Sequence, residues 1–220
     1  MKAPARKSSA GSGSRSSTPK AQSSSASLGA AAHAVSLLLV QSESRLVLAE
    51  SCTGGLVSAS LAAIPGISDW LCGSLVTYRN DAKTQWLGIS KRVLNRAGAV
   101  SRIVAEAMAC AALKKTPEAR LAASITGHLG PGAPGKQDGQ IFIAIAMRQT
   151  KNPRGKPHVL CEQFRLLTDR SRRTTTPVAS TPAAIKKAAQ SGAAVRAKRQ
   201  VLASHAVLFM VRSLLESGSF

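Results

Sequence analysis

Aromatic residues, cysteines and long apolar runs are all scarce in this sequence. Aromatic side chains make up 3% of the 220 residues, which argues against single-strand nucleic-acid binding, since such proteins stack bases on aromatic rings. Four cysteines are too few for a disulfide scaffold in a chain of this length. Apolar runs such as Ile141–Met147 stop far short of the roughly 18 residues of a membrane span. The four histidines are scattered and no Cys-x-x-Cys or His-x-x-x-His pattern occurs, so we expect no metal site.

Acidic residues are also scarce, and the chain carries a formal charge of +20. Residues 1–28 hold five basic residues, no acid and mostly Ser, Ala and Gly. This composition buries too little apolar surface to fold, so we predict a disordered basic tail. Residues 165–199 hold nine basic residues and one acid. Both segments permit contact with nucleic acid, but we favour a solvated tail and a solvated polar insertion at about 171–193.

The order of apolar patterns and breaks predicts alternating strands and helices. Strands are expected at residues 46–50, 74–79, 121–126, 140–148 and 158–166, and helices at 31–42, 56–64, 101–115 and from 202 onward. The turn-rich link at 150–157 predicts a hairpin, and residues 174–192 are expected to form a polar loop. The predicted apolar helix faces are Ile103, Ala107, Cys110 and Ala111, and Leu202, Ala206, Phe209 and Met210. Such alternation is typical of a layered α/β domain.

The first of two glycine-rich loops, Ser51–Gly55, leaves a predicted strand and opens a predicted helix. The first amides of a helix lack intrahelical acceptors and lie at the positive end of its dipole, so they can bind an anion or an oxyanion. Gly54 and Gly55 would let a phosphate approach the backbone. A Ser or Thr here is equally typical of a helix N-cap, and the local sequence leaves both interpretations open.

The second loop, Gly127–Gly135, contains four glycines and two prolines and joins two predicted strands. It lacks the Gly-Lys-Ser/Thr ending of a P-loop, and it leads into a strand where a dinucleotide-binding fingerprint would lead into a helix. Because both loops follow strands, we expect them to meet at the carboxyl edge of one sheet, where open α/β folds bind ligands.

The candidate reactive side chains near these loops are Ser51, Cys52 and those of the polar segment Val76–Lys83. Ser51 is a candidate nucleophile, and Lys83 a candidate base if burial lowers its pKa, although such a lysine is more often a surface residue. Tyr78 could donate to an oxyanion or stack on a flat ring, or be a half-buried strand residue. Cys52 is a competing nucleophile, although a buried cysteine usually packs as a small apolar residue.

Four short motifs follow one another along the chain. They are Ala49-Glu50-Ser51-Cys52-Thr53-Gly54-Gly55, Val76-Thr77-Tyr78-x-Asn80-x-Ala82-Lys83, Gly98-Ala99-Val100-Ser101 and Thr126-Gly127-x-x-Gly130-Pro131-Gly132. Together they resemble the CinA C-terminal domain family, which includes bacterial nicotinamide mononucleotide amidases. The resemblance covers about residues 29–170 and, loosely, the last helix.

The resemblance implies a single three-layer α/β/α sandwich with a mixed sheet, formed by residues 29–220. It implies hydrolysis of nicotinamide mononucleotide to nicotinate mononucleotide and ammonia, with no cofactor and no metal. Ser51 and Lys83 would form a Ser–Lys catalytic pair, and Tyr78 would be a third catalytic residue. Ser51 would either form an acyl-enzyme or position a water molecule. The substrate-binding residues implied are Thr53, Gly54, Gly55, Asn80, Thr126, Gly127, Gly130 and an arginine for the phosphate, Arg170 or Arg196.

The sequence departs from the family pattern in two places. His128-Leu129 replaces a small apolar pair in the second loop, and residues 174–192 extend a normally short link. We also expect the larger N-terminal domain of full-length CinA proteins to be absent. We therefore expect a stand-alone cytoplasmic amidase, with a nucleotide as its small-molecule partner and a homo-oligomer possible. The alternatives are a catalytically silent nucleotide-sensing or nucleic-acid-associated module, and a Ser–Lys hydrolase of another amide.

Overall fold

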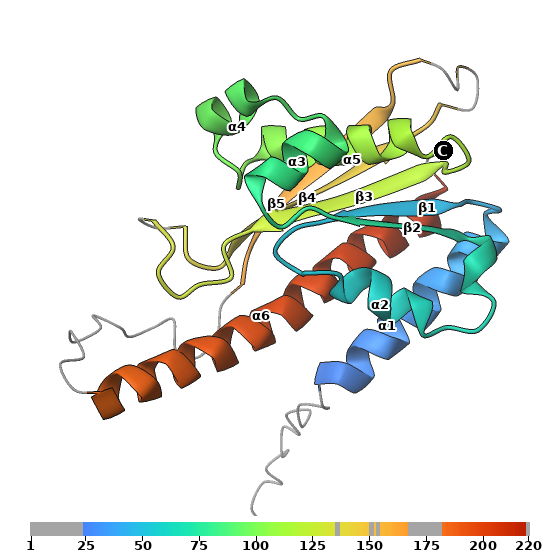
Figure 1. The fold of residues 1–220 in the computed structure, drawn as a ribbon. Coiled ribbons are helices and arrows are strands. Elements are labelled where there is room, and N and C mark those ends of the chain that lie inside the picture. Colours follow the sequence, from blue (N-terminus) through green and yellow to red (C-terminus); the bar gives the residue numbers. More distant parts are fainter. Residues whose placement is uncertain (1–23, 135–136, 150–151, 153–154, 167–181, 219–220) are drawn as a thin grey trace, which may run out of the picture.

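The protein is built on a five-stranded mixed sheet in the order β2-β1-β3-β4-β5 (Figure 1). A computed structural model describes residues 24–134, 137–149, 152, 155–166 and 182–218. The strands are β1 (Leu46–Glu50), β2 (Leu71–Val76), β3 (Leu121–Gly127), β4 (Gln140–Met147) and β5 (His158–Arg165). β1 runs parallel to β2 and β3, whereas β4 is antiparallel to β3 and β5. The predicted mixed sheet and hairpin are confirmed, and β2 begins three residues earlier than predicted.

Helices cover both faces of the sheet (Figure 1). One face carries α1 (Ser24–Gln41), α2 (Leu56–Ala62) and α6 (Pro182–Ser217), and the other carries α3 (Asn80–Leu87), α4 (Lys91–Ala97) and α5 (Arg102–Lys115). A short 3-10 turn at Ile67–Asp69 leads from α2 into β2. The predicted three-layer α/β/α sandwich is therefore confirmed.

β1 lies inside the sheet between β2 and β3, and all five of its residues are buried. Leu46 and Leu48 pack into the core beneath α1, α2 and α6, whereas Val47 and Ala49 pack into the core beneath α3, α4 and α5. Successive side chains of a strand point to opposite faces of its sheet. A strand covered on both faces is therefore mostly apolar, and apart from Glu50 at its end this one was recognisable as a continuous apolar run.

The predicted boundary of the N-terminal tail at residue 28 is wrong. Helix α1 begins at Ser24, and Leu28 is buried in the core. The alanine-rich stretch that follows favours a helix, and burial of Leu28 extends that helix toward the N-terminus. The rest of the predicted tail, residues 1–23, lies outside the described residues.

The polar loop predicted at 174–192 is wrong from Pro182 onward, because α6 begins there. Proline suits the first position of a helix, where its missing N–H needs no partner. The alanines that follow are strong helix formers, so composition alone was a misleading sign of a loop. Residues 174–181, and with them much of the expected insertion, lie outside the described part of the chain.

The predicted apolar faces of the two long helices are confirmed in part: Ala107, Cys110, Ala111 and Ala206 are partly buried against the two cores, and Met210 is buried. Ile103 on α5 and Phe209 on α6 are 58% and 64% exposed, and Leu202 is also exposed. The buried residues are Val104, Ala105, Met108, Ala109, Ala112 and Leu113 on α5, and Ala203, Val207, Leu208, Met210, Val211, Leu214 and Leu215 on α6. Helices this rich in alanine and leucine have apolar residues on several faces. The sequence pattern alone does not show which face packs on the sheet.

Candidate active site

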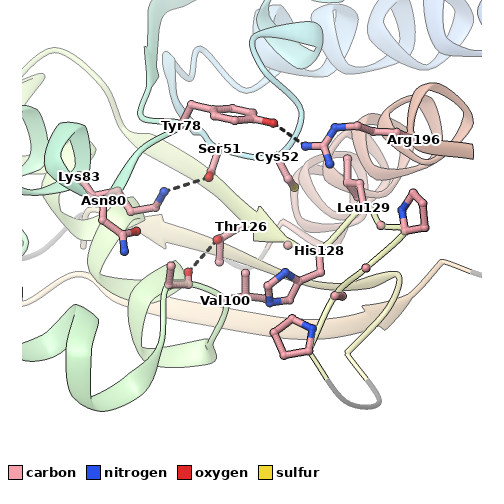
Figure 2. A pocket seen from close by; sticks show the side chains of 17 residues that line it. Ser51, Cys52, Tyr78, Asn80, Lys83, Val100, Thr126, His128, Leu129 and Arg196 are labelled. Carbon is pink, nitrogen blue, oxygen red and sulfur yellow. Dashed lines mark hydrogen bonds between the residues drawn. The ribbon is translucent and has the colours of Figure 1, made fainter. Parts of the chain in front are cut away.

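The carboxyl ends of the three parallel strands meet at one edge of the sheet and border a pocket of about 290 Å³ (Figure 2). Its wall consists of Ser51, Cys52, Tyr78, Asn80, Lys83, Ala99, Val100, Thr126, residues 127–134 and Arg196. The predicted meeting of the two glycine-rich loops at this edge is confirmed for Ser51 and Cys52 of the first loop and for most of the second. None of these described wall residues carries a carboxylate.

Ser51 and Lys83 are in direct contact in this pocket. The Lys83 Nζ donates hydrogen bonds to the Ser51 Oγ at 2.9 Å and to the Thr77 carbonyl oxygen at 2.7 Å (Figure 2). Ser51 follows β1, and Lys83 lies in the first turn of α3, which begins just after β2. Lys83 is only 1% exposed, so the alternative interpretation as a surface lysine is wrong.

The environment of Lys83 favours its neutral form. Burial lowers the pKa of Lys83 from 10.5 to about 8, because removing an ammonium group from water disfavours the charged state. Both of its hydrogen-bond acceptors, the Ser51 hydroxyl and the Thr77 carbonyl, are uncharged. A neutral amine 2.9 Å from a hydroxyl can accept the proton of that hydroxyl, which is the geometry of an activated serine nucleophile.

Cys52, the competing nucleophile, is poorly suited to the role. Its side chain is 3% exposed, and burial raises the pKa of its thiol to about 12. The thiolate is the reactive form of cysteine, so this thiol stays protonated and unreactive near neutral pH. Of the two candidate nucleophiles, Ser51 is therefore the better suited, because its hydroxyl contacts the amine of Lys83.

The amides at the start of α2 are occupied by Glu50, so the predicted anion site at Gly54 and Gly55 is wrong. The buried Glu50 carboxylate accepts hydrogen bonds from the Thr53 hydroxyl (2.8 Å), the amides of Gly55 (3.0 Å), Val57 (3.2 Å) and Ser58 (2.9 Å), and the Ser74 hydroxyl (3.2 Å). Thr53, Gly54 and Gly55 do not line the pocket. They act indirectly, because they turn the chain that carries Ser51. An acidic residue at the end of a buried strand was the signal that sequence reasoning missed.

The second glycine-rich loop is fixed to α6 by an ion pair that the sequence did not predict. The guanidinium of Arg199, 1% exposed, donates to both carboxylate oxygens of Asp138 at 2.7 Å and to the Leu129 carbonyl oxygen at 3.3 Å. Gly130 passes so close that an added Cβ would lie 1.9 Å from Asp138 Oδ1, and its φ is 56°. Only glycine fits that position. No local signal links Asp138 to an arginine 61 residues away.

Tyr78 and Arg196 form a contact at the mouth of the pocket (Figure 2). Arg196 donates a hydrogen bond to the Tyr78 hydroxyl, and its guanidinium carbon lies 6.0 Å from the centre of the Tyr78 ring. Tyr78 follows the end of β2 and is 54% exposed, so its interpretation as a half-buried strand residue is wrong. Of the two arginines considered for a phosphate, Arg196 lines the pocket and Arg170 lies outside the described residues.

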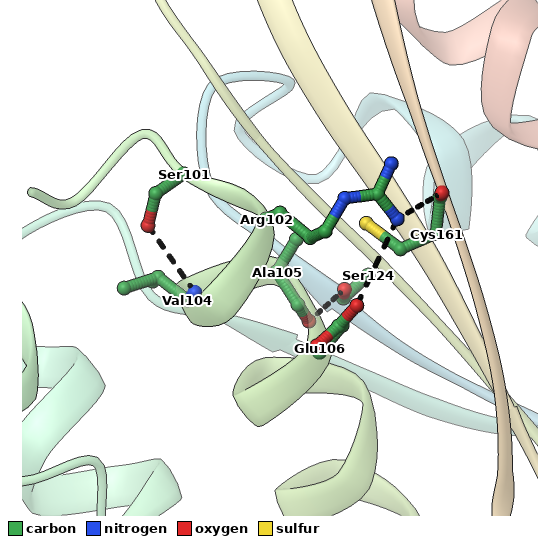
Figure 3. Close-up of polar contacts among 7 residues, drawn as sticks. All are labelled: Ser101, Arg102, Val104, Ala105, Glu106, Ser124 and Cys161. Carbon is green, nitrogen blue, oxygen red and sulfur yellow. Dashed lines mark hydrogen bonds and ion pairs between the residues drawn. The ribbon is translucent and has the colours of Figure 1, made fainter. Parts of the chain in front are cut away.

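Hydrogen bonds around α5 hold the remaining wall of the pocket. The Thr126 hydroxyl donates to the Ala99 carbonyl at 2.8 Å and so fixes the loop before α5. In Figure 3, Ser101 Oγ accepts a hydrogen bond from the Val104 amide (3.3 Å) at the start of α5. The Arg102 side chain donates a hydrogen bond to the Cys161 carbonyl on β5 and forms an ion pair with Glu106 (3.8 Å). The Ser124 hydroxyl on β3 donates a hydrogen bond to the Ala105 carbonyl (2.6 Å). The predicted N-cap Ser101 is confirmed. Thr126 therefore positions Ala99 and Val100.

The other predicted wall residues, Asn80, Gly127 and Gly130, all line the pocket, as does His128. Within the described ranges, no group of three or more His, Cys, Asp or Glu side chains is placed to hold a metal ion. The described helices include none long and apolar enough to cross a membrane. The four cysteines are all free thiols.

A comparison with known families agrees with the four motifs. The sequence profile of the CinA C-terminal domain matches residues 29–185. The chain belongs to this family. A CinA-like protein of Geobacter metallireducens is 48% identical over 103 residues, which are 46% of this chain and 25% of that protein. A putative competence-damage inducible protein of Clostridioides difficile is 44% identical over 114 residues, 51% of this chain and 27% of that protein. The chain thus aligns with about a quarter of the length of these curated relatives.

Solved structures of CinA proteins share the fold. The competence/damage inducible protein CihA of Agrobacterium tumefaciens has a TM-score of 0.65 at 26% identity, covering 85% of this chain and 94% of that one. A CinA superfamily protein of Enterobacter cloacae has a TM-score of 0.66 at 21% identity, covering 93% of this chain and 99% of that one. The described residues therefore have the same fold as these proteins, in agreement with the family match.

Proposed function

We propose that this CinA-family protein is an amidase that hydrolyses nicotinamide mononucleotide to nicotinate mononucleotide and ammonia. The observation that carries the proposal is the 2.9 Å contact between Ser51 Oγ and the buried amine of Lys83. A serine next to a lysine of lowered pKa is an arrangement that attacks carbonyl carbons. The resemblance to the bacterial amidases of the family supplies the substrate.

In the proposed reaction, the Ser51 Oγ attacks the amide carbon and neutral Lys83 accepts the hydroxyl proton. Backbone amides of the surrounding loops stabilise the negative charge on the carbonyl oxygen. Lys83 then gives the proton to the leaving nitrogen, which departs as ammonia and leaves an ester on Ser51. Water, deprotonated by Lys83, attacks that ester and releases the carboxylic acid. The net reaction consumes one water and needs no further reactant.

The pocket suits a small anionic substrate. Its volume of about 290 Å³ is close to the lower end of the range for small-molecule sites, roughly 300–1,000 Å³. Lys83 and Arg196 bring basic groups to it, and no described wall residue is acidic. The polar, basic wall supports a phosphorylated substrate over a neutral apolar amide.

The test is ammonia release by purified full-length protein from nicotinamide mononucleotide, compared with free nicotinamide and NAD. We expect turnover of the mononucleotide alone, and a loss in kcat of about 1,000-fold or more in Ser51→Ala and in Lys83→Met. Methionine fills the space of the lysine without burying an unpaired charge, so the second variant should fold. The exposed Lys91 provides the matched control, and Lys91→Met should keep wild-type activity.

Two results would contradict the proposal. The first is full activity in Ser51→Ala. The second is no turnover by wild-type protein that is folded by circular dichroism and still binds nicotinate mononucleotide. The second result would favour the silent nucleotide-sensing module, and turnover of a different amide would favour a Ser–Lys hydrolase of other specificity.

A further inference from the structure

The imidazole of His128 is the part of the pocket wall that the proposed reaction leaves without a role. Both His128 and Leu129 depart from the family pattern, and the structure sends their side chains to different places. Leu129 is 1% exposed and packs in the core beneath α6, whereas His128 lines the pocket. Successive side chains of an extended chain point to opposite sides, so the burial of Leu129 directs His128 into the pocket.

The backbone of His128 is fixed where β3 ends. Its amide donates a hydrogen bond to the Gln140 carbonyl oxygen (2.9 Å), and its carbonyl oxygen accepts one from the Gly139 amide (2.9 Å). The preceding residue, Gly127, packs so closely on β4 that an added Cβ would lie 2.4 Å from the Cγ2 atom of Ile141. The chain beneath the imidazole is therefore held in place before any ligand binds.

The imidazole itself is not used by the protein. Within the described ranges, its nitrogens make no hydrogen bond and no ion pair with other groups of the chain. Asp138, an acid in the segment that follows the second glycine-rich loop, is paired with Arg199. Tyr78, the other aromatic ring of the described wall, already has a cation beside it, because the guanidinium carbon of Arg196 lies 6.0 Å from its centre. His128 is therefore the ring of the described wall that is left for a ligand.

A positively charged ring finds no counter-charge in the described wall of this pocket. The proposed substrate carries a positive charge on its ring nitrogen, and that ring bears the amide that Ser51 attacks. Lys83 and Arg196 are basic, and none of the described wall residues is a carboxylate. The π electrons of an aromatic ring offer the remaining attraction for a cation. Figure 2 shows His128 across the pocket from the Ser51–Lys83 contact, so a ring whose amide reaches Ser51 can extend toward the imidazole.

We propose that His128 makes the pocket selective for amides of positively charged pyridinium rings, an inference that rests on the proposed amidase function. In its neutral form the imidazole lies against the face of the substrate ring and attracts the ring charge through its π electrons. The amide of an uncharged ring gains no such attraction. His128 is thus a specificity-determining residue, and the chemistry remains with Ser51 and Lys83.

Two ligands that differ in ring charge test this selectivity. Nicotinamide mononucleotide has a pyridinium ring, and its dihydro form has the same amide, ribose and phosphate on an uncharged ring. Calorimetric titration of Ser51→Ala measures both affinities without turnover. In that background His128→Lys, which places a positive charge beside the ring, should weaken binding of the pyridinium form at least about 10-fold. It should change binding of the dihydro form less than about threefold.

Two further substitutions separate the aromatic face from the size of the side chain. His128→Phe keeps an aromatic face and should bind the pyridinium form within about threefold of its parent. His128→Ile removes the face and should weaken that binding about 3- to 10-fold, with little change for the dihydro form. In the active enzyme His128→Ile should raise KM for the mononucleotide by the same factor and leave kcat unchanged, because the imidazole takes no part in the reaction.

The matched control is His33→Lys, which adds the same charge at an exposed histidine of α1 outside the pocket and should bind both ligands like its parent. The selectivity is overturned if His128→Lys weakens both ligands equally, if His128→Ile binds the pyridinium form as tightly as its parent, or if the parent binds neither ligand. The expected binding differences without ammonia release by wild-type protein would contradict the amidase alone and leave the role of His128 standing.

Discussion

At the scale of single residues, Lys83 shows how burial gives an ordinary lysine a pKa near neutral pH. Its downward pKa shift, from 10.5 to about 8, corresponds to about 3 kcal/mol of disfavoured charge. The folded state therefore carries this cost below pH 8, and the cost disappears as pH rises toward 10.5, where the unfolded chain also loses the proton. In return, about a quarter of the molecules hold a neutral amine at pH 7.5, instead of about one in a thousand.

This shift predicts the pH dependence of the reaction. If neutral Lys83 is the base, kcat/KM should rise about tenfold per pH unit below pH 7 and level off above about pH 8. The measurement is a pH–rate profile of ammonia release from nicotinamide mononucleotide between pH 6.5 and 9.5. The second ionisation of the phosphate, near pH 6, lies below this range. A flat profile would contradict lysine as the base, and a rate that still rises tenfold per pH unit at pH 9.5 would mean that the amine is not desolvated.

At the scale of secondary-structure elements, Glu50 joins three of them. Its carboxylate ends β1, accepts the first amides of α2 and bonds to Ser74 on β2. A carboxylate here complements the positive end of the helix dipole. It also satisfies amides that would otherwise be buried without partners. The loop that presents Ser51 to Lys83 thus depends on a residue that does not line the pocket.

Glu50→Gln should therefore lower the free energy of unfolding by about 2–4 kcal/mol, because an amide nitrogen cannot accept the hydrogen bonds that one oxygen now receives. Urea denaturation measures this loss. Glu118→Gln, at an exposed position, is the control and should change stability by less than about 0.5 kcal/mol. Equal stabilities of Glu50→Gln and the control would show that the helix start is satisfied by other groups.

The elements that could be predicted from the sequence are those whose signal is local. β1, β3 and β4 are apolar runs bounded by breaks, and their ranges were predicted to within one residue. α3 and α4 are short and polar, so they were missed. The faces of α5 and α6 depend on what they pack against, which a pattern rich in alanine and leucine does not reveal. In the site, Ser51 and Lys83 were nominated by residue type and motif. The pairing of Asp138 with Arg199 has no signature along the chain.

At the scale of the whole molecule, α6 both packs on one face of the sheet and contributes to the pocket wall. It is the last described element, and it packs with α1, the first, on the same face of the sheet (Figure 1). The same helix supplies Arg196 to the pocket and Arg199 to the second glycine-rich loop. The shape of the pocket therefore depends on long-range contacts between α6 and a loop between β3 and β4.

The Arg199–Asp138 ion pair tests this dependence, because its two partners are unequally buried. The Arg199 side chain is 2% exposed and that of Asp138 is 40% exposed. Asp138→Asn leaves a buried, uncompensated guanidinium and should lower the free energy of unfolding by about 2–3 kcal/mol. Arg199→Met leaves a carboxylate that water can reach, so its loss should be smaller, about 1 kcal/mol. Adding Asp138→Asn to Arg199→Met should cost almost nothing more.

Chemical denaturation of the three variants measures these differences, with Arg212→Met as the control. Arg212 forms an exposed i,i+4 pair with Glu216 on the same helix, at 2.8 Å, and its loss should change stability by less than about 0.5 kcal/mol. A larger loss for Arg199→Met than for Asp138→Asn would mean that packing of the arginine, and not pairing of its charge, holds the loop. With the predicted order, the carboxylate serves to make a buried arginine tolerable, and that arginine ties the last helix to the pocket wall.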